Sequence, residues 1–391
     1  MTTVLDRATA VARTYDVPDT SDVLAALPDR HGVLSWVRDG EGFAAWGEAF
    51  RLEFTGPDRF AQAAAGWRRL ADRITAGDPS AVVAFASFGF TGRSVLVVPK
   101  VLVGRRNGRS WVTTVGEPRV GLSTPVVAPG PMRWSDGALP VHRWRAAVAE
   151  AVRRIRSGQL DKVVLARDLV AEADEPVDPR FVLRKLAARH RKCWTFAVDG
   201  LVGATPELLL RRAGDQVSSR VLAGTSWPGA DQELMRSESY LDEHRFAVDS
   251  LLRTLGPHCT SLRTSGPSVL QLRGISHLST DVTGTAGGAG LLDLVGAVHP
   301  TAAVGGTPGP VAARLIEELE SPLDRGRYTG PVGWVDAAGD GELGIALRCA
   351  QLSGTRARLF AGAGLVAESD PDVEVRETHA KFAAMREVLG D

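Results

Sequence analysis

The chain has 391 residues, of which 44% are hydrophobic and 24% charged, so it can bury a large core. Lys plus Arg and Asp plus Glu both number 46, which gives a net charge of zero. The composition therefore does not favour binding to nucleic acid or to an anionic membrane, and an anionic ligand must be met by a local site.

The cysteines, Cys193, Cys259 and Cys349, are widely spaced and form no CxxC pair. This pattern argues against a disulfide framework or a zinc site and favours a reducing compartment. The first residues lack the apolar core of a signal peptide, and the longest uncharged run, 294–313, is interrupted by prolines and glycines. We therefore expect a soluble, cytoplasmic protein.

The first part of the chain predicts mainly strands. Residues 1–30 indicate a loosely ordered lead-in with short helical pieces, and residues 31–54 are strand-like. Apolar residues at spacings of three to four predict a helix over 58–77. Strands follow within 81–115, with a hairpin turn at Asn107-Gly108.

A similar order of strands and turns recurs over 194–221. This weak internal repeat favours two related α+β halves that face each other, with a ligand between them. Chance similarity among strand–turn–strand units explains the repeat equally well.

The second part of the chain carries clearer helix signals, because apolar stripes at helical spacing end at capping residues. The elements expected here are a Pro- and Gly-rich linker over 116–139, a helix over 141–156 that Gly158 ends, a strand over 160–170, a helix over 240–255, a helix-like run over 310–320 after a glycine-rich turn, a strand that ends at Arg348, and a last helix over 371–389 with Asp370 as N-cap.

Three charged residues share one face of that last helix. Glu374, Glu377 and Lys381 follow at i, i+3 and i+7. A solvated face with a Glu–Lys pair explains this spacing as well as a functional site does. The functional alternative is a hard cation such as Mg²⁺, which prefers carboxylate oxygens.

Two further residues are candidates for proton transfer. Lys162 alternates with Val164 and Ala166 on one face of a strand, and partial removal from water favours the neutral, basic form of an amine. Glu207 follows a tight turn and precedes Leu-Leu-Leu, a setting in which a carboxyl group can act as an acid. An ordinary strand-end lysine and a capping glutamate remain the plain alternatives. GxGxxG, P-loop, HExxH and GxSxG motifs are absent from the sequence, which excludes several common enzyme classes.

Taken together, motifs from about residue 140 to the end resemble the chorismate-utilising enzymes, the family of isochorismate, salicylate, anthranilate and aminodeoxychorismate synthases. The matching stretches, in family order, are Lys162-Val-Val-Leu-Ala-Arg167, Gly203-Ala-Thr-Pro-Glu207, Leu222-Ala-Gly-Thr225, Glu243-His244, His277-Leu278, His299-Pro-Thr-Ala-Ala-Val-Gly-Gly306, Arg325-Gly-Arg-Tyr-Thr-Gly-Pro-Val-Gly333, Arg348, Ala361-Gly-Ala-Gly364, Ser369-Asp-Pro371 and Glu374-Val-Arg-Glu377 with Lys381.

The resemblance implies an α+β fold with extended, mostly antiparallel sheets and packed helices around a central site. It implies one chorismate-binding domain over 1–391, where length alone would suggest two or three. Residues 1–135 would form the variable half and residues 140–391 the motif-bearing catalytic half. No extended apolar stripe on the surface demands a partner, so we expect a monomer.

The resemblance also implies the site. A Mg²⁺ ion held by Glu243, Glu374 and Glu377 would grip the ring carboxylate of chorismate. The other carboxylate would be held by an arginine and backbone N–H groups, which suit an anion. The substrate-binding positions implied in this way are Thr225, His277, Thr301, Tyr328, Arg348, Gly362, Ala363, Gly364 and Lys381.

Within the family, the chain is most similar to the isochorismate synthases. A lysine at position 162 implies that water is activated to attack C2 of chorismate, while Glu207 protonates the departing C4 hydroxyl. The stretches Val221–Thr225 and Thr301–Val304 differ from the aminating and salicylate-forming branches. The product would feed menaquinone or siderophore synthesis.

Two rival interpretations stay open, a salicylate synthase that also eliminates pyruvate and a catalytically silent homologue. Two departures from the family pattern, Ser226-Trp-Pro-Gly229 and Ser239, put loop closure and rate in doubt more than the type of reaction.

Overall fold

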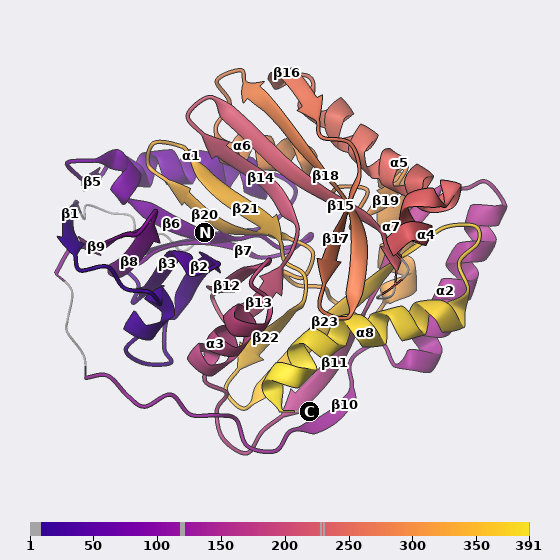
Figure 1. Ribbon diagram of the computed structural model, residues 1–391, viewed down its shortest axis with the longest axis horizontal. Coiled ribbons are helices and arrows are strands. Elements are labelled where there is room, and N and C mark those ends of the chain that lie inside the picture. Colours follow the sequence, from indigo (N-terminus) through magenta and orange to yellow (C-terminus); the bar gives the residue numbers. More distant parts are fainter. Residues whose placement is uncertain (1–8, 118–121, 227–228, 230, 391) are drawn as a thin grey trace.

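The computed structural model describes residues 9–117, 122–226, 229 and 231–390 (Figure 1). It is an α+β structure built on two large, mostly antiparallel sheets, as the sequence predicts. The larger sheet runs in the order β10 (Arg133–Asp136), β11 (Lys162–Glu172), β23 (Arg356–Leu365), β22 (Cys349–Ser353), β13 (Leu201–Thr205), β12 (Trp194–Val198), β2 (Leu34–Arg38), β3 (Glu41–Trp46), β8 (Val101–Arg106), β9 (Arg109–Val115), β1 (Ala10–Val17) and β5 (Ile74–Thr75), with β19 (Gly306–Thr307) paired to β11.

The smaller sheet lies against the larger one and continues the core. Its strands follow the order β16 (Cys259–Thr264), β18 (Ile275–Ala286), β15 (Gln216–Ser226), β14 (Leu208–Ala213), β21 (Gly341–Ile345), β20 (Pro331–Asp336), β6 (Val83–Ser87), β7 (Ser94–Val98) and β4 (Phe50–Phe54), with β17 (Ser268–Leu272) paired to β18.

Helices cover the outer faces of both sheets. Side chains of α1 (Arg59–Ala71), α5 (Glu238–Leu255) and α6 (Leu291–Val298) form one core with the smaller sheet. Those of α3 (Pro179–Arg189), α8 (Pro371–Leu389) and the 3₁₀ turn η1 (Val23–Ala26) form another with the larger sheet. The remaining helices are α2 (Val141–Arg156) and α7 (Gly309–Glu320), which pack into the core between the sheets, and the short α4 (Asp231–Arg236) and η2 (Pro79–Ala81).

The central core follows from the alternation of side chains along each strand. In β12, Trp194, Phe196 and Val198 point between the sheets, whereas Ala197 points to the outer helical layer. A strand buried on both faces is mostly apolar, and Thr195 is the single polar residue of β12. Within the described part of the chain, no helix combines the length and the apolar character needed to span a membrane.

The two similar stretches of sequence occupy both sheets in opposite order. The first places β6 and β7 in the smaller sheet and β8 and β9 in the larger one. The second places β12 and β13 in the larger sheet and β14 and β15 in the smaller one. The strands predicted within 31–54, 81–115 and 160–170 are confirmed, as is the turn at Asn107-Gly108, where both residues have positive φ. The strand expected to end at Arg348 ends at Ile345 instead, and Arg348 has the left-handed φ of 47°.

Two predicted helices are confirmed at both ends. The bounds of α2 and α8 agree with the sequence analysis, and the Asp370 side chain accepts hydrogen bonds from the N–H groups of Asp372 and Val373. The helix expected over 58–77 is too long, because α1 ends at Ala71 and Ile74 instead pairs with β1. Tertiary pairing overrides the apolar spacing at this end.

Two predictions of irregular structure are partly wrong. The lead-in contains the eight-residue strand β1, which pairs with β9, while residues 1–8 lie outside the described part. The expected linker contains β10, which pairs with the end of β11, and its residues 118–121 are not described. β10 is the edge strand of the larger sheet, and β1 lies beside the two-residue edge strand β5. Pairing with distant strands therefore decides both structures, and the local sequence pattern is weak.

Candidate active site

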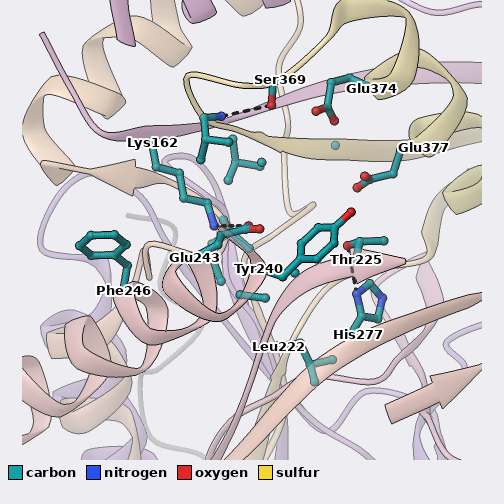
Figure 2. Close-up of a pocket in the computed structure, with 18 of the residues that line it drawn as sticks. Lys162, Leu222, Thr225, Tyr240, Glu243, Phe246, His277, Ser369, Glu374 and Glu377 are labelled. Carbon is teal, nitrogen blue, oxygen red and sulfur yellow. Dashed lines mark hydrogen bonds and ion pairs between the residues drawn. The ribbon is translucent and has the colours of Figure 1, made fainter. Parts of the chain in front are cut away.

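A cavity of about 1110 Å³ opens between β11, β15, β18, β23, α5 and α8 (Figure 2). Its described lining residues lie between Ile155 and Lys381, within the motif-bearing part of the chain. The prediction of a ligand between two repeated halves is therefore wrong. The cavity forms where α5 and α8, which pack on different sheets, flank the strands β11, β15 and β23 (Figure 1).

The cavity brings together nearly every residue that the sequence singles out. Those that line it are Lys162, Glu207, Thr225, Glu243, His277, Tyr328, Arg348, Gly362, Gly364, Glu374, Glu377 and Lys381. Thr301 and Ala363 are the exceptions among the predicted positions. Ala363 points its side chain into the core between the sheets, and Thr301 borders a much smaller void that also touches Glu207.

Glu207 is a buried carboxyl group in a fixed backbone setting. Its carbonyl accepts the N–H of Ile345 at 3.2 Å, and its own N–H donates to Thr205 Oγ1 at 3.3 Å. Burial raises the pKa of Glu207 to about 8, against the opposing effects of a backbone hydrogen bond from Leu222 and the charges of Lys162 and Lys381. The group is therefore protonated at neutral pH, as a general acid requires. Glu207 directly precedes the strand β14 rather than capping a helix, so the capping alternative is wrong.

Lys162 lies at the start of β11 and points into the cavity. Its Nζ donates to Glu243 Oε1 at 2.8 Å, with side-chain exposures of 8% and 21% (Figure 2). A Cβ added at Gly364 would lie 3.1 Å from Lys162 Cε and 3.5 Å from Glu243 Oε1, so the glycine leaves room for this pair. The ordinary strand-end lysine, solvated and unpaired, is excluded.

Glu374 and Glu377 extend from α8 toward the same space (Figure 2). Burial, followed by the negative charges of Glu377 and Glu243, raises the pKa of Glu374 to about 7. Glu377 forms an ion pair with Lys381, but both side chains are mostly buried, so the solvated-face interpretation is wrong. Three carboxylates with mutual repulsion form a donor set that suits a hard divalent cation.

The carboxylates are not held together as a ready-made metal site. Across the residues that the structure describes, no three Asp, Glu, His or Cys side chains gather closely enough to hold an ion. Lysine side chains partner two of the candidate ligands instead, Lys162 at Glu243 and Lys381 at Glu377. The assignment of Mg²⁺ to Glu243, Glu374 and Glu377 therefore stays a prediction.

A positive, hydrogen-bonding end of the cavity is built around Arg348. This residue has φ 47°, a left-handed conformation that non-glycine residues rarely adopt. Its Nη2 donates to His277 Nε2 at 3.3 Å, and His277 Nδ1 lies 3.2 Å from Thr225 Oγ1. Burial, reinforced by the charges of Arg348 and Lys381, lowers the pKa of His277 well below its usual value, so the imidazole is neutral. The guanidinium thus meets a neutral partner and retains its charge for an anion.

The side of the cavity formed by β23 adds further polar groups. Lys381 Nζ donates to the Gly362 carbonyl at 2.9 Å. Tyr328 stacks on Phe360 with ring centroids 5.3 Å apart, and a Cβ at Gly362 would approach its hydroxyl to 3.2 Å. Burial raises the pKa of Tyr328, which keeps the phenol as a hydrogen-bond donor.

Sequence reasoning missed several lining residues. Tyr240 and Phe246 lie on α5 beside Glu243, and Ala303, Val304 and Thr329 come from loops. The spacing of Tyr240 and Glu243, three apart on a helix, was a usable signal. The loop positions lie within the motif stretches quoted above, but the sequence analysis did not single them out as site residues. Of the two departures from the family pattern, residues 227–228 and the side chain of Ser239 lie outside the described part.

Residues 131–390 match the family model described as chorismate binding enzyme. The chain belongs to this family of chorismate-binding enzymes. It is 39% identical to isochorismate synthase DhbC of Bacillus subtilis over 269 residues, which covers 63% of this chain and 67% of DhbC. It is 32% identical to the salicylate biosynthesis isochorismate synthase of Pseudomonas aeruginosa, over 98% of this chain and 91% of that protein.

Solved structures agree with this assignment. The crystal structure of DhbC from Bacillus anthracis superposes with a TM-score of 0.79 at 30% identity, covering 94% of this chain and 98% of that one. MenF, the menaquinone-specific isochorismate synthase of Escherichia coli, gives a TM-score of 0.81 at 24% identity, over 98% of this chain and 97% of that one, and so shows a shared fold.

Proposed function

We propose that this chain is a Mg²⁺-dependent isochorismate synthase, which converts chorismate to isochorismate. The observation that carries the proposal is the presence in one cavity of a buried, protonated carboxyl group, Glu207, and a buried amine, Lys162. The relatives named as isochorismate synthases support the same assignment.

The reaction exchanges one hydroxyl group for another and therefore needs both a base and an acid. Lys162 takes a proton from water as the water oxygen bonds to C2 of chorismate. The ring double bonds shift, and the C4–oxygen bond breaks. Glu207 donates its proton to the departing hydroxyl, which leaves as water, so the product is an isomer of the substrate.

The substrate is a dianion, and the cavity offers separate sites for its two carboxylates. Arg348, with His277 and Thr225 behind it, and the phenol of Tyr328 suit one carboxylate. Mg²⁺, if bound by Glu243, Glu374 and Glu377, would supply positive charge for the ring carboxylate and for the negative charge that builds there. The pKa of Glu374, raised first by burial and then by the charge of Glu377, supports this role, because a cation would stabilise the ionised carboxylate against both effects.

The proposal is tested by incubating the purified protein with chorismate and Mg²⁺ and following the mixture by proton NMR. An isochorismate synthase gives a mixture of chorismate and isochorismate. Salicylate with an equal amount of pyruvate as the main early product would identify a salicylate synthase. Chorismate that stays unchanged with folded protein would identify a silent homologue.

A further inference from the structure

The pairing of β11, the strand that carries Lys162, is interrupted along one of its edges. Along its other edge, β11 pairs with β23 throughout Val163–Glu172. On the interrupted edge, β19 pairs with Lys162 and Val163, and β10 pairs with Leu169–Glu172. The backbone of residues 164–168 therefore lies between two strands, where buried N–H and carbonyl groups need other partners.

The Val164 N–H and the Asp168 carbonyl, at the two ends of this interruption, bond to the backbone of Gly305 and Gly137. An ion pair fills the middle. Glu320 Oε1 accepts the N–H of Ala166 at 2.7 Å, and Arg325 Nη2 donates to the Val164 carbonyl at 2.7 Å. The two side chains bind each other at two points, Nη2 to Oε1 at 2.5 Å and Nε to Oε2 at 2.8 Å, and each is only 3% exposed. A two-point guanidinium–carboxylate pair has a fixed geometry, so it can set the position of the strand as a neighbouring strand would.

The same guanidinium reaches two other segments that line the cavity. Arg325 Nη1 donates to the Val304 carbonyl at 3.0 Å and to Thr329 Oγ1 at 3.3 Å. Val304 and Thr329 line the cavity, as do Lys162 and Val164 on β11. One buried side chain therefore holds three separate segments of the cavity from behind.

The placement of Glu320 is difficult to explain by stability alone. It is the last residue of α7, where the helix dipole disfavours a carboxylate. A buried ion pair is also weak evidence for stability, because apolar residues of similar volume often serve as well. If the pair holds β11 and the two loops in one geometry, this role explains both why Glu320 lies at the end of α7 and why the two charged side chains are buried there.

We propose that Glu320 and Arg325 are positioning residues that hold Lys162 and the adjoining loops in the geometry that the reaction needs. This inference rests on the proposed function of the cavity. Glu320 and Arg325 are not among the described residues that line the cavity, so neither is expected to contact substrate. Their loss should therefore reduce turnover far more than substrate binding, because small displacements of a reacting group are costly.

The test compares two Arg→Lys variants that each keep the positive charge and lose the two-point geometry. Arg325→Lys changes the proposed clamp. Arg180→Lys is the matched control, because Arg180 is equally buried, pairs with Asp178 at 2.7 Å and donates to backbone carbonyls of Pro28, Thr124 and Pro125. Thermal unfolding, kcat and KM for chorismate, and amide hydrogen exchange of peptides from β11 are measured for both.

For Arg325→Lys we expect kcat to fall on the order of 10²-fold with a much smaller change in KM, together with faster exchange of β11 amides. For Arg180→Lys we expect a comparable loss of thermal stability with kcat and β11 exchange unchanged. Equal kcat in the two variants, or unchanged β11 exchange in Arg325→Lys, would overturn the proposal.

Glu320→Gln provides a second variant with the same shape and the same expected outcome. If neither Arg325→Lys nor Glu320→Gln folds while Arg180→Lys does, the pair is a folding determinant and the proposal is overturned. The exchange measurement needs no turnover, so it tests the position of β11 separately. A wild-type protein that leaves chorismate unchanged would contradict the proposed function, and the exchange result would still decide whether the pair orders β11.

Discussion

Lys162 Nζ lies 2.8 Å from Glu243 Oε1, so the candidate base is paired with one of the candidate metal ligands. The two residues are far apart in sequence and come from β11 and α5, which the fold brings to the same side of the cavity. Anything that binds the Glu243 carboxylate also changes the nearest partner of Lys162. The hydrogen-bond partner of Lys162 therefore depends on whether a cation is bound to the Glu243 carboxylate, because the two side chains are in direct contact.

Removal of Mg²⁺ should abolish activity. With EDTA the carboxylates of Glu374 and Glu377 keep their mutual repulsion, and the ring carboxylate of the substrate loses its counter-ion. Activity should return on addition of Mg²⁺, and Glu377→Gln should bind Mg²⁺ more weakly by calorimetry while its circular dichroism stays unchanged. Full activity in EDTA would contradict the metal assignment.

Replacement of Lys162 by Ala should lower turnover on the order of 10²-fold or more, which is the usual contribution of a positioned proton-transfer group. Chorismate affinity should change much less, since Lys162 is not placed among the groups that hold the carboxylates. Turnover is measured by the NMR assay and affinity by calorimetry. Near-normal turnover in this variant would assign Lys162 to a structural role.

Replacement of Glu207 by Gln should also lower turnover on the order of 10²-fold or more, because the amide cannot donate the proton that the C4 hydroxyl needs. In the wild-type protein the rate should fall as pH rises above about 8, where Glu207 loses its proton. A Glu207→Gln variant with normal turnover, or a wild-type rate that is flat from pH 7 to 9, would contradict the assignment.

The same group makes stability depend on pH. Between the ordinary pKa of a glutamic acid and about 8, the folded chain keeps a proton that the unfolded chain has lost. Its contribution to the free energy of unfolding is therefore complete at low pH and decreases as pH rises, by about 1.4 kcal/mol for each pH unit. Denaturant unfolding at pH 6 and pH 8 should show Glu207→Gln gaining stability relative to wild type at the higher pH. An unchanged difference would show that Glu207 is already ionised.

Features set by local sequence were predictable. The apolar stripe and the capping residues fixed the bounds of α2 and α8, and the family motifs identified most of the lining of the cavity. The raised pKa of Glu207 followed from a carboxyl group placed ahead of a buried strand.

Features set by contacts between distant residues were not predictable. The end of α1 depends on pairing between β5 and β1, and the role of Arg325 depends on carbonyl groups of Val164 and Val304. Thr301 was placed by its position in a motif, but the residue borders a small separate void, and its hydroxyl is buried without a hydrogen-bond partner among the described residues. No periodic pattern in the sequence reports such contacts.

Isochorismate synthase activity is measured most directly by proton NMR of chorismate with purified protein and Mg²⁺ near neutral pH, with and without a high ammonium concentration. We expect a chorismate–isochorismate mixture that stops short of completion, the same ratio when isochorismate is the starting material, and no aminated product. Pyruvate released in step with an aromatic product, or an aminated ring when ammonium is present, would contradict this expectation.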